Sequence, residues 1–96
     1  TIYLDLENKI TPNKIHNELS KFYKNKKFVK VLKRDSLVST NNVINTNNCY
    51  ISVCKSKYSN KIIILSAIDN LIKGGAGQAV QNLNNKFNFS ETTGLK

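Results

Sequence analysis

Several residue types are missing or rare in this chain of 96 residues, and each absence narrows the class of protein. Methionine is absent even from the first position, and residues 1–6 already alternate like a strand, so we expect a piece of a longer protein. No apolar run approaches the roughly 18 residues of a membrane-spanning helix, and no signal-peptide pattern opens the chain. Neither a membrane span nor secretion is therefore indicated.

Side chains that carry chemistry are also scarce. The single histidine, His16, follows apolar Ile15 at the flank of a predicted helix, where we expect it to be solvated. A catalytic nucleophile needs a neighbouring base, and neither cysteine has a recognisable one in the sequence. The dinucleotide pattern G-x-G-x-x-G and the P-loop are both absent. The sequence predicts no catalytic residue within this chain.

The two cysteines, Cys49 and Cys54, lie five residues apart. One such pair has poor spacing for a metal site, so no metal ligand is predicted. If both lie on one strand, the odd separation points them to opposite faces, which excludes a disulfide between them. We expect buried, reduced thiols, as is usual in a cytosolic protein.

Acidic residues are few: six against 15 lysines and arginines, which gives a net charge of +9. Seven of the basic residues fall between Lys21 and Arg34, so a basic nucleic-acid-binding domain is one hypothesis. Lysine, asparagine and isoleucine share AT-rich codons, however, and base composition alone raises their number. Arg34 is the only arginine, although base-reading surfaces favour arginine. Nucleic acid is therefore the less favoured partner class.

The chain length allows one domain with a modest core. Alternating apolar residues predict a strand over residues 2–7 with one buried face. Thr11 and Pro12 predict the start of a helix that runs to about residue 23, with threonine as its cap. Further strands are predicted over residues 28–32, 50–54 and 61–67, with a hairpin turn at residues 57–60.

The segment of residues 34–48 is polar and predicts a loop, with a short edge strand around Val43 and Ile44. The strand over residues 61–67 is apolar without alternation, so we expect both of its faces to be covered. A helix over residues 70–87 completes the order. This arrangement predicts an α+β fold, with a mixed or antiparallel sheet and two main helices packed against it.

The most informative stretch is residues 66–82, in which Asp69 and Asn70 open the last helix and glycine occupies positions 74, 75 and 77. Glycine inside a helix costs roughly 1 kcal/mol relative to alanine, so three glycines indicate close approach. Either another protein element packs there, or the N-terminal turn of the helix faces a cofactor. The apolar stripe of this helix consists of Ile72, Ala76, Val80, Leu83 and Phe87.

Residues 66–82 and the ending at residues 91–95 resemble the C-terminal part of the N-acetyl-gamma-glutamyl-phosphate reductase family. A shorter version of the first motif is similar to aspartate-semialdehyde dehydrogenases, while residues 78–82 and 91–95 favour the reductase. The similarity runs over nearly the whole chain, because it also includes residues 1–3, 22–23, 28–31 and 45–49.

The resemblance implies the C-terminal catalytic and dimerisation domain of the glyceraldehyde-3-phosphate-dehydrogenase-like family. Residues 1–68 would form part of that domain, and residues 69–96 a helix and tail that return to a nucleotide-binding domain outside this chain. The family uses NADPH to reduce N-acetyl-gamma-glutamyl phosphate to N-acetylglutamate semialdehyde in arginine biosynthesis, through a cysteine that attacks the acyl phosphate. A cytoplasmic homo-oligomer is implied.

On this resemblance the cofactor-side candidates are Asn70, Gly74, Gly75 and Gln78, because side chains at the glycines would occupy space that the nicotinamide ring needs. Cys49 matches a family position other than the nucleophile's, and His16 matches no catalytic position. The chain alone is therefore expected to be inactive, and the choice between NADPH and NADH is made outside it. The alternative of a different class is a standalone interaction module that dimerises through its sheet.

Overall fold

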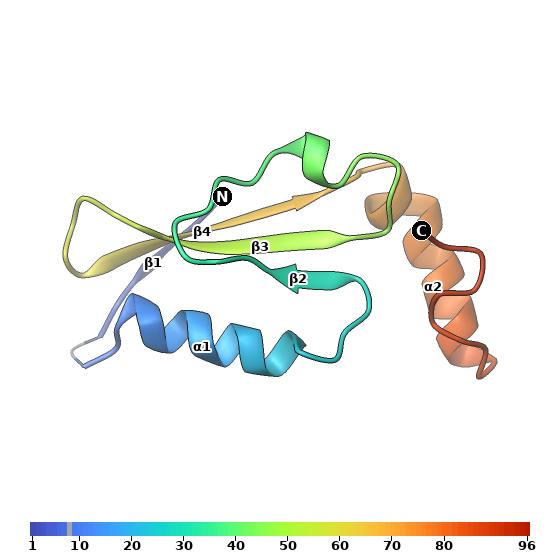
Figure 1. The fold of residues 1–96 in the computed structure, drawn as a ribbon, viewed down its shortest axis with the longest axis horizontal. Helices are drawn as coiled ribbons and strands as arrows, with labels where there is room; N and C mark the ends of the chain where they lie inside the picture. The colour runs from blue at the N-terminus through green and yellow to red at the C-terminus, as the bar shows by residue number, and fades with distance from the viewer. Residues whose placement is uncertain (8) are drawn as a thin grey trace.

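Four strands, two helices and two short helical turns make up the computed structural model, which describes residues 1–7 and 9–96 (Figure 1). The strands are β1 (Ile2–Asp5), β2 (Val29–Val31), β3 (Cys49–Lys55) and β4 (Lys61–Ile68). The helical elements are α1 (Pro12–Tyr23), the 3₁₀ turn η1 (Thr40–Asn42), the π-helical turn η2 (Ile72–Ala76) and α2 (Gly77–Lys86). The predicted α+β class is confirmed.

The strands form one mixed sheet in the order β1-β4-β3-β2. β4 pairs antiparallel with both β1 and β3, while β2 pairs parallel with β3. A short hairpin joins β3 to β4, as predicted for antiparallel neighbours. The parallel pair instead needs a crossover connection, and residues 32–48 provide it.

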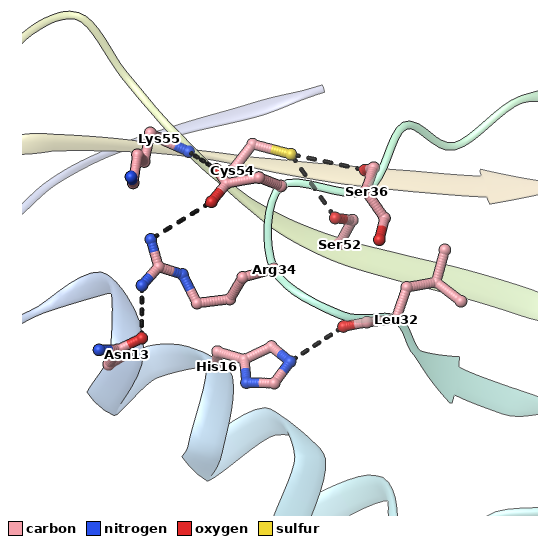
Figure 2. A network of polar contacts seen from close by, with 9 residues as sticks. Asn13, His16, Leu32, Arg34, Ser36, Ser52, Cys54 and Lys55 are labelled. Carbon is pink, nitrogen blue, oxygen red and sulfur yellow. Dashed lines mark hydrogen bonds and ion pairs between the residues drawn. The ribbon is translucent and has the colours of Figure 1, made fainter.

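The two faces of the sheet are covered differently. Because side chains alternate along a strand, Val53 and Ile62 lie on one face, and Ser52 and Cys54 lie on the other. α1 packs against β2 and β3. On the opposite side the Cys54 thiol donates to the Ser36 carbonyl at 3.7 Å, so the crossover passes over that side (Figures 1 and 2). We call these the helix-covered face and the helix-free face.

The core is small. Val53 and Ile62 on the helix-covered face are fully buried, as are Val43 in the crossover and nearly all of Phe28. The buried face predicted for the first strand is wrong, because every residue of β1 is exposed. β1 is an edge strand that pairs with β4 on one side. The prediction that both faces of β4 are covered is also wrong, since only Ile62 in that strand is fully buried.

α1 follows the predicted local rules at its start. Thr11 Oγ1 accepts a hydrogen bond from the Lys14 amide at 3.2 Å, and Pro12 occupies the first turn. The expectation of a solvated His16 is wrong. Its side chain is half-buried, and Nε2 donates to the Leu32 carbonyl at 2.9 Å (Figure 2). This contact ties the middle of α1 to the residue that follows β2.

The edge strand predicted around Val43 and Ile44 is wrong. The segment forms η1 instead, because the Asn42 side-chain oxygen accepts from the Ser39 amide at 2.9 Å and closes a capping box. Val43 then turns inward and is fully buried, whereas Ile44 stays exposed. A local side-chain cap therefore outweighs the β-branched pair at this position.

Both cysteines lie on β3, five residues apart and therefore on opposite faces, as predicted. The expectation of full burial is wrong, because both are half-buried. Cys49 Sγ lies 3.5 Å from Ser66 Oγ. Cys54 Sγ lies 3.5 Å from Ser52 Oγ, as Figure 2 shows. Each thiol thus has a hydroxyl neighbour on its own face of the sheet.

The single helix predicted over residues 70–87 is interrupted. Gly75, inside η2, has φ −146° and ψ −114°, so the helical path is broken within η2, before α2 begins at Gly77. The predicted apolar stripe is not buried within the described residues: Leu83 is 49% exposed and Phe87 is 63% exposed. The buried positions of α2 are Gly77, Gln81 and Asn84. α2 therefore turns its polar side inward and its apolar side outward.

The C-terminal tail explains this reversal. Asn84 Nδ2 donates to the carbonyls of Glu91 (3.3 Å) and Thr93 (2.9 Å), and the tail runs back along α2 (Figure 1). The last carbonyl, of Lys96, accepts from the Asn47 amide at 2.6 Å. The inner side of α2 is thus occupied by polar backbone, and polar side chains match it.

The overall shape is elongated, at 44 × 25 × 18 Å, with α2 at one end of the sheet (Figure 1). The radius of gyration is 15.0 Å, against about 13 Å for a compact domain of this size. Among the described residues, no helix has the length and apolar character needed to cross a membrane.

Candidate functional site

Asp69 closes the end of β4 and begins the glycine-rich segment. Its Oδ1 accepts from the amides of Leu71 (2.8 Å) and Ile72 (3.0 Å), and its Oδ2 accepts from the Asn45 amide at 2.8 Å. The Asn45 hydrogen bond, followed by those of Ile72 and Leu71, holds the pKa of Asp69 below its ordinary value. The carboxylate therefore fixes where η2 starts relative to the crossover.

Three of the four predicted cofactor-side residues lie together at this start. The Asn70 side chain lies over Gly74, since a Cβ added at Gly74 would be 2.8 Å from Asn70 Oδ1. A Cβ at Gly75 would be 3.4 Å from the Asn70 carbonyl. All three residues are exposed. Glycine at position 74 thus makes room for the Asn70 amide.

Gln78 stands apart from that group. It is half-buried in the first turn of α2, and its Nε2 donates to Asn82 Oδ1 at 2.9 Å, one helical turn further on. Its amide is bonded along α2, beyond the break at Gly75. A cofactor role for Gln78 stays a prediction, as it does for the other three.

The sequence leaves open whether the glycines serve protein packing or a cofactor, and for Gly77 the structure shows protein packing. It is buried, and a Cβ there would lie 2.5 Å from Asn47 Oδ1, 2.7 Å from Ile72 Cγ2 and 2.8 Å from the Ile72 carbonyl. Real Cβ atoms do not approach so closely, so this glycine serves protein packing. Gly74 and Gly75, by contrast, lie on the exposed side.

The sequence analysis missed a polar cluster beneath η2. Lys73, Asn47 and Glu91 all bond to the side chain of Gln81, which is nearly buried. One signal could have found it: positions 77, 81 and 84 repeat at i, i+4 and i+7 beside the apolar stripe, and two of them are polar amides.

A second polar group joins α1 to β3 (Figure 2). The Arg34 guanidinium donates to Asn13 Oδ1 on α1 and lies 3.5 Å from the Asp35 carboxylate, whose other oxygen accepts from the Lys55 amide at 2.7 Å. The only arginine is therefore engaged inside the fold. Neither His16 nor Cys54 is bonded to the other, so this group forms no nucleophile–base pair among the contacts described.

The remaining basic residues of the segment are exposed lysines. They surround the end of α1 and the strand that follows: Lys21, Lys24, Lys26, Lys27, Lys30 and Lys33. Among the residues that the structure describes, no group of three or more histidine, cysteine or acidic side chains is placed to hold a metal ion.

Comparison with known protein families identifies the family to which the sheet region is similar. The sequence model of the family described as "Semialdehyde dehydrogenase, dimerisation domain" matches residues 1–70. The chain belongs to this family. The resemblance stated from the motifs is thereby confirmed, including its relation to the semialdehyde dehydrogenases.

Curated relatives of this semialdehyde dehydrogenase-family chain include several named reductases. Proteins called N-acetyl-gamma-glutamyl-phosphate reductase from Thermoanaerobacter pseudethanolicus and Clostridium botulinum are 45% and 48% identical over 95 residues. These matches cover 99% of this chain and 28% of each relative. The "probable" chloroplastic reductase of Arabidopsis thaliana is 41% identical over 95 residues, which cover 24% of its length. The chain thus spans about a quarter of the relatives that it matches.

Proposed function

We propose that the protein containing this chain is an NADPH-dependent reductase that converts N-acetyl-gamma-glutamyl phosphate to N-acetylglutamate semialdehyde and phosphate. One observation carries the proposal: identity of 44–48% across essentially the whole chain to bacterial proteins that bear this enzyme's name. The dimerisation-domain family of residues 1–70 supports it. The proposed reaction, the reduction of an acyl phosphate to an aldehyde, would be a step of arginine biosynthesis.

The exposed start of η2 fits a nicotinamide ring. The Asn70 amide offers a donor and an acceptor, which is the complement of the carboxamide on the ring. Gly74 and Gly75 present no side chain beside it. The cofactor, when bound, would supply the hydride. The residues of this chain would hold and orient the carboxamide and keep space open for the ring.

Two exposed apolar surfaces, one on α2 and one on the helix-free face, support contacts with further parts of the protein. On α2 the outward stripe would face the nucleotide-binding part of the same protein, so that residues 1–68 form the sheet region and residues 69–96 the return element. On the helix-free face, Tyr3 is 72% exposed and Leu37 in the crossover is 88% exposed. A second copy of the protein would cover that side, since large apolar side chains in the open mark contact sites.

We further propose a cytoplasmic location. Cys49 and Cys54 lie on opposite faces of β3 and cannot be joined to each other, and unpaired cysteines are usual in a reducing compartment. N-acetylated amino-acid phosphates and NADPH are also soluble metabolites, so the reaction needs no membrane.

The test is turnover by the purified protein that contains this chain. We expect N-acetyl-gamma-glutamyl phosphate to cause NADPH oxidation, and the semialdehyde with phosphate to reduce NADP in the reverse direction. The control is the same assay with the aspartyl phosphate that aspartate-semialdehyde dehydrogenases reduce, which should give much slower turnover. Absence of turnover with the N-acetylglutamyl substrate, or faster turnover with the aspartyl one, would contradict the proposal. The 96-residue chain by itself is expected to be inactive.

A further inference from the structure

The polar cluster beneath η2 has a single hub, the side chain of Gln81, which is 9% exposed. Its Oε1 accepts from Lys73 Nζ at 2.6 Å and from Asn47 Nδ2 at 2.8 Å. Its Nε2 donates to Glu91 Oε1 at 2.7 Å. One amide therefore joins η2, the end of the crossover at Asn47 and the C-terminal tail.

Lys73 extends the cluster toward β2. Its Nζ lies 5.6 Å from the centroid of the Phe28 ring, and Phe28 is one of the few core residues. A cation over an aromatic face is attracted to it, more strongly when water is excluded. The charged end of Lys73 is thus held by Gln81 of α2 and by Phe28 of the sheet region.

Asn47 completes the anchorage. It is fully buried; its backbone amide donates to the Lys96 carbonyl, and its side-chain amide donates to Gln81. Its Oδ1 has no hydrogen-bond partner among the described residues and faces the bare backbone of Gly77. Leaving a buried acceptor unpaired is costly, so the position of this side chain is set by its other contacts. The junction between η2 and α2 therefore packs on a fully buried side chain that is held by hydrogen bonds at its backbone and at its amide.

We propose that Gln81, Lys73 and Asn47 are positioning residues for the turn formed by residues 70–75. η2 already packs on the end of β4, and Asp69 fixes its first residue. The cluster supplies the second point of attachment, which sets the angle of the turn and hence the direction of the Asn70 amide. This inference rests on the proposed function, because it takes Asn70 to be the cofactor-facing group.

A fixed angle matters for hydride transfer, because a misplacement of about 1 Å can cost roughly a hundredfold in rate. The three positioning residues touch neither ring nor substrate in this account. They act only through the turn, so their loss should weaken the binding of the cofactor and leave the binding of the acyl phosphate unchanged.

The first test uses amide hydrogen exchange on the protein that contains this chain. The amides of Gly74 and Ala76 bond to the carbonyls of Asp69 and Leu71, so these two hydrogen bonds span the turn. We expect Gln81→Ala to speed their exchange about fivefold or more, the equivalent of losing one typical hydrogen bond. Asn85→Ala, one turn along α2 at an exposed site, is the matched control and should leave them unchanged.

Equal exchange in Gln81→Ala and wild type would overturn the proposal. If Gln81→Ala also speeds exchange at the β3 and β4 amides, two variants of Lys73 separate a local effect from a general loss of stability. Lys73→Arg keeps a charged donor and should show wild-type exchange in the turn, whereas Lys73→Met should show faster exchange. Identical behaviour of these two variants would also overturn the proposal.

The second test separates positioning from mere loss of stability. We expect Gln81→Ala to raise the KM for NADPH about tenfold while the KM for the acyl phosphate stays constant; Asn85→Ala should change neither. A destabilised but correctly positioned enzyme would only lower the amount of active protein, and that result would overturn the proposal. If wild type shows no turnover at all, the proposed function fails, and the exchange result still reports on the cluster.

Discussion

Gly77 marks the tightest approach described in the site region. A Cβ there would meet Asn47 Oδ1, Ile72 Cγ2 and the Ile72 carbonyl, all within 2.8 Å. Two of these atoms belong to groups that cannot move freely, one being backbone and the other a buried amide. We therefore expect Gly77→Ala to lower the free energy of unfolding by about 1–3 kcal/mol, although alanine is the better helix former.

Urea unfolding would measure this change, with Asn85→Ala at an exposed site of α2 as the control. A Gly77→Ala variant as stable as Asn85→Ala would contradict the close packing of Gly77 against Asn47 and Ile72.

Asp69 predicts a pH dependence with a definite sign. Its pKa is lowered from 3.8 in the folded state, chiefly by the Asn45 amide and then by Ile72 and Leu71. A carboxyl with a lower folded pKa stabilises the fold above its unfolded pKa, and this contribution is lost as the pH falls through the folded value. We expect Asp69→Asn to reduce stability near neutral pH and to weaken the acid dependence below about pH 4.

The measurement is urea unfolding of wild type and variants between neutral and acid pH. Asp5→Asn is the control, because Asp5 is an exposed strand residue whose ion pair with Lys61 lies in solvent. An acid dependence that is the same in Asp69→Asn and Asp5→Asn would contradict the capping role assigned to Asp69.

The elements differ in how far the sequence could predict them. α1 was predictable, because Thr11 and Pro12 set its start through local contacts that any helix makes. The exposed stripe of α2 was not, because periodicity identifies an apolar side but not what covers it. The inward side of α2 faces the tail through Asn84, a contact seven to nine residues ahead that no periodic pattern signals.

The candidate site shows the same division. Asn70, Gly74 and Gly75 are adjacent in sequence, so their grouping was within reach of a motif. The Gln81 cluster contains a hydrogen bond between residues 34 positions apart in the sequence, and only the folded crossover brings Asn47 to α2. Long-range polar contacts of this kind follow from topology, which local patterns do not specify.

The outward stripe of α2 predicts a contrast between the isolated chain and the complete protein. Leu83 is 49% exposed here, so Leu83→Gln should change the stability of the isolated 96-residue chain by no more than about 0.5 kcal/mol. If the stripe is covered in the complete protein, the same change should cost about 1–2 kcal/mol there.

Urea unfolding of both proteins gives the comparison, with exposed Asn85→Gln as the control in each. A loss that is equally small in the complete protein would mean that α2 keeps its apolar side in the open, and the return of residues 69–96 would have to be abandoned.

The molecule as a whole is elongated and has little core, so we expect its stability to depend on protein that covers its exposed apolar surfaces. On the helix-free face Tyr3 pairs directly with Ile63, while Ile2 lies on the helix-covered face. We expect Tyr3→Asp to shift the complete protein toward smaller species and Ile2→Asp to leave its assembly unchanged. Sedimentation velocity would measure this, and dissociation by Ile2→Asp alone would place the contact on the other face.

The central claim is that the turn at residues 70–75 carries the cofactor side of a reductase. Its most direct test is the steady-state kinetics of Asn70→Ala in the complete protein, beside exposed Asn85→Ala. We predict that Asn70→Ala raises the KM for NADPH or lowers kcat by about tenfold, as expected for losing the hydrogen bonds to a carboxamide, while the KM for N-acetyl-gamma-glutamyl phosphate stays constant. Kinetics equal to those of Asn85→Ala would contradict the claim.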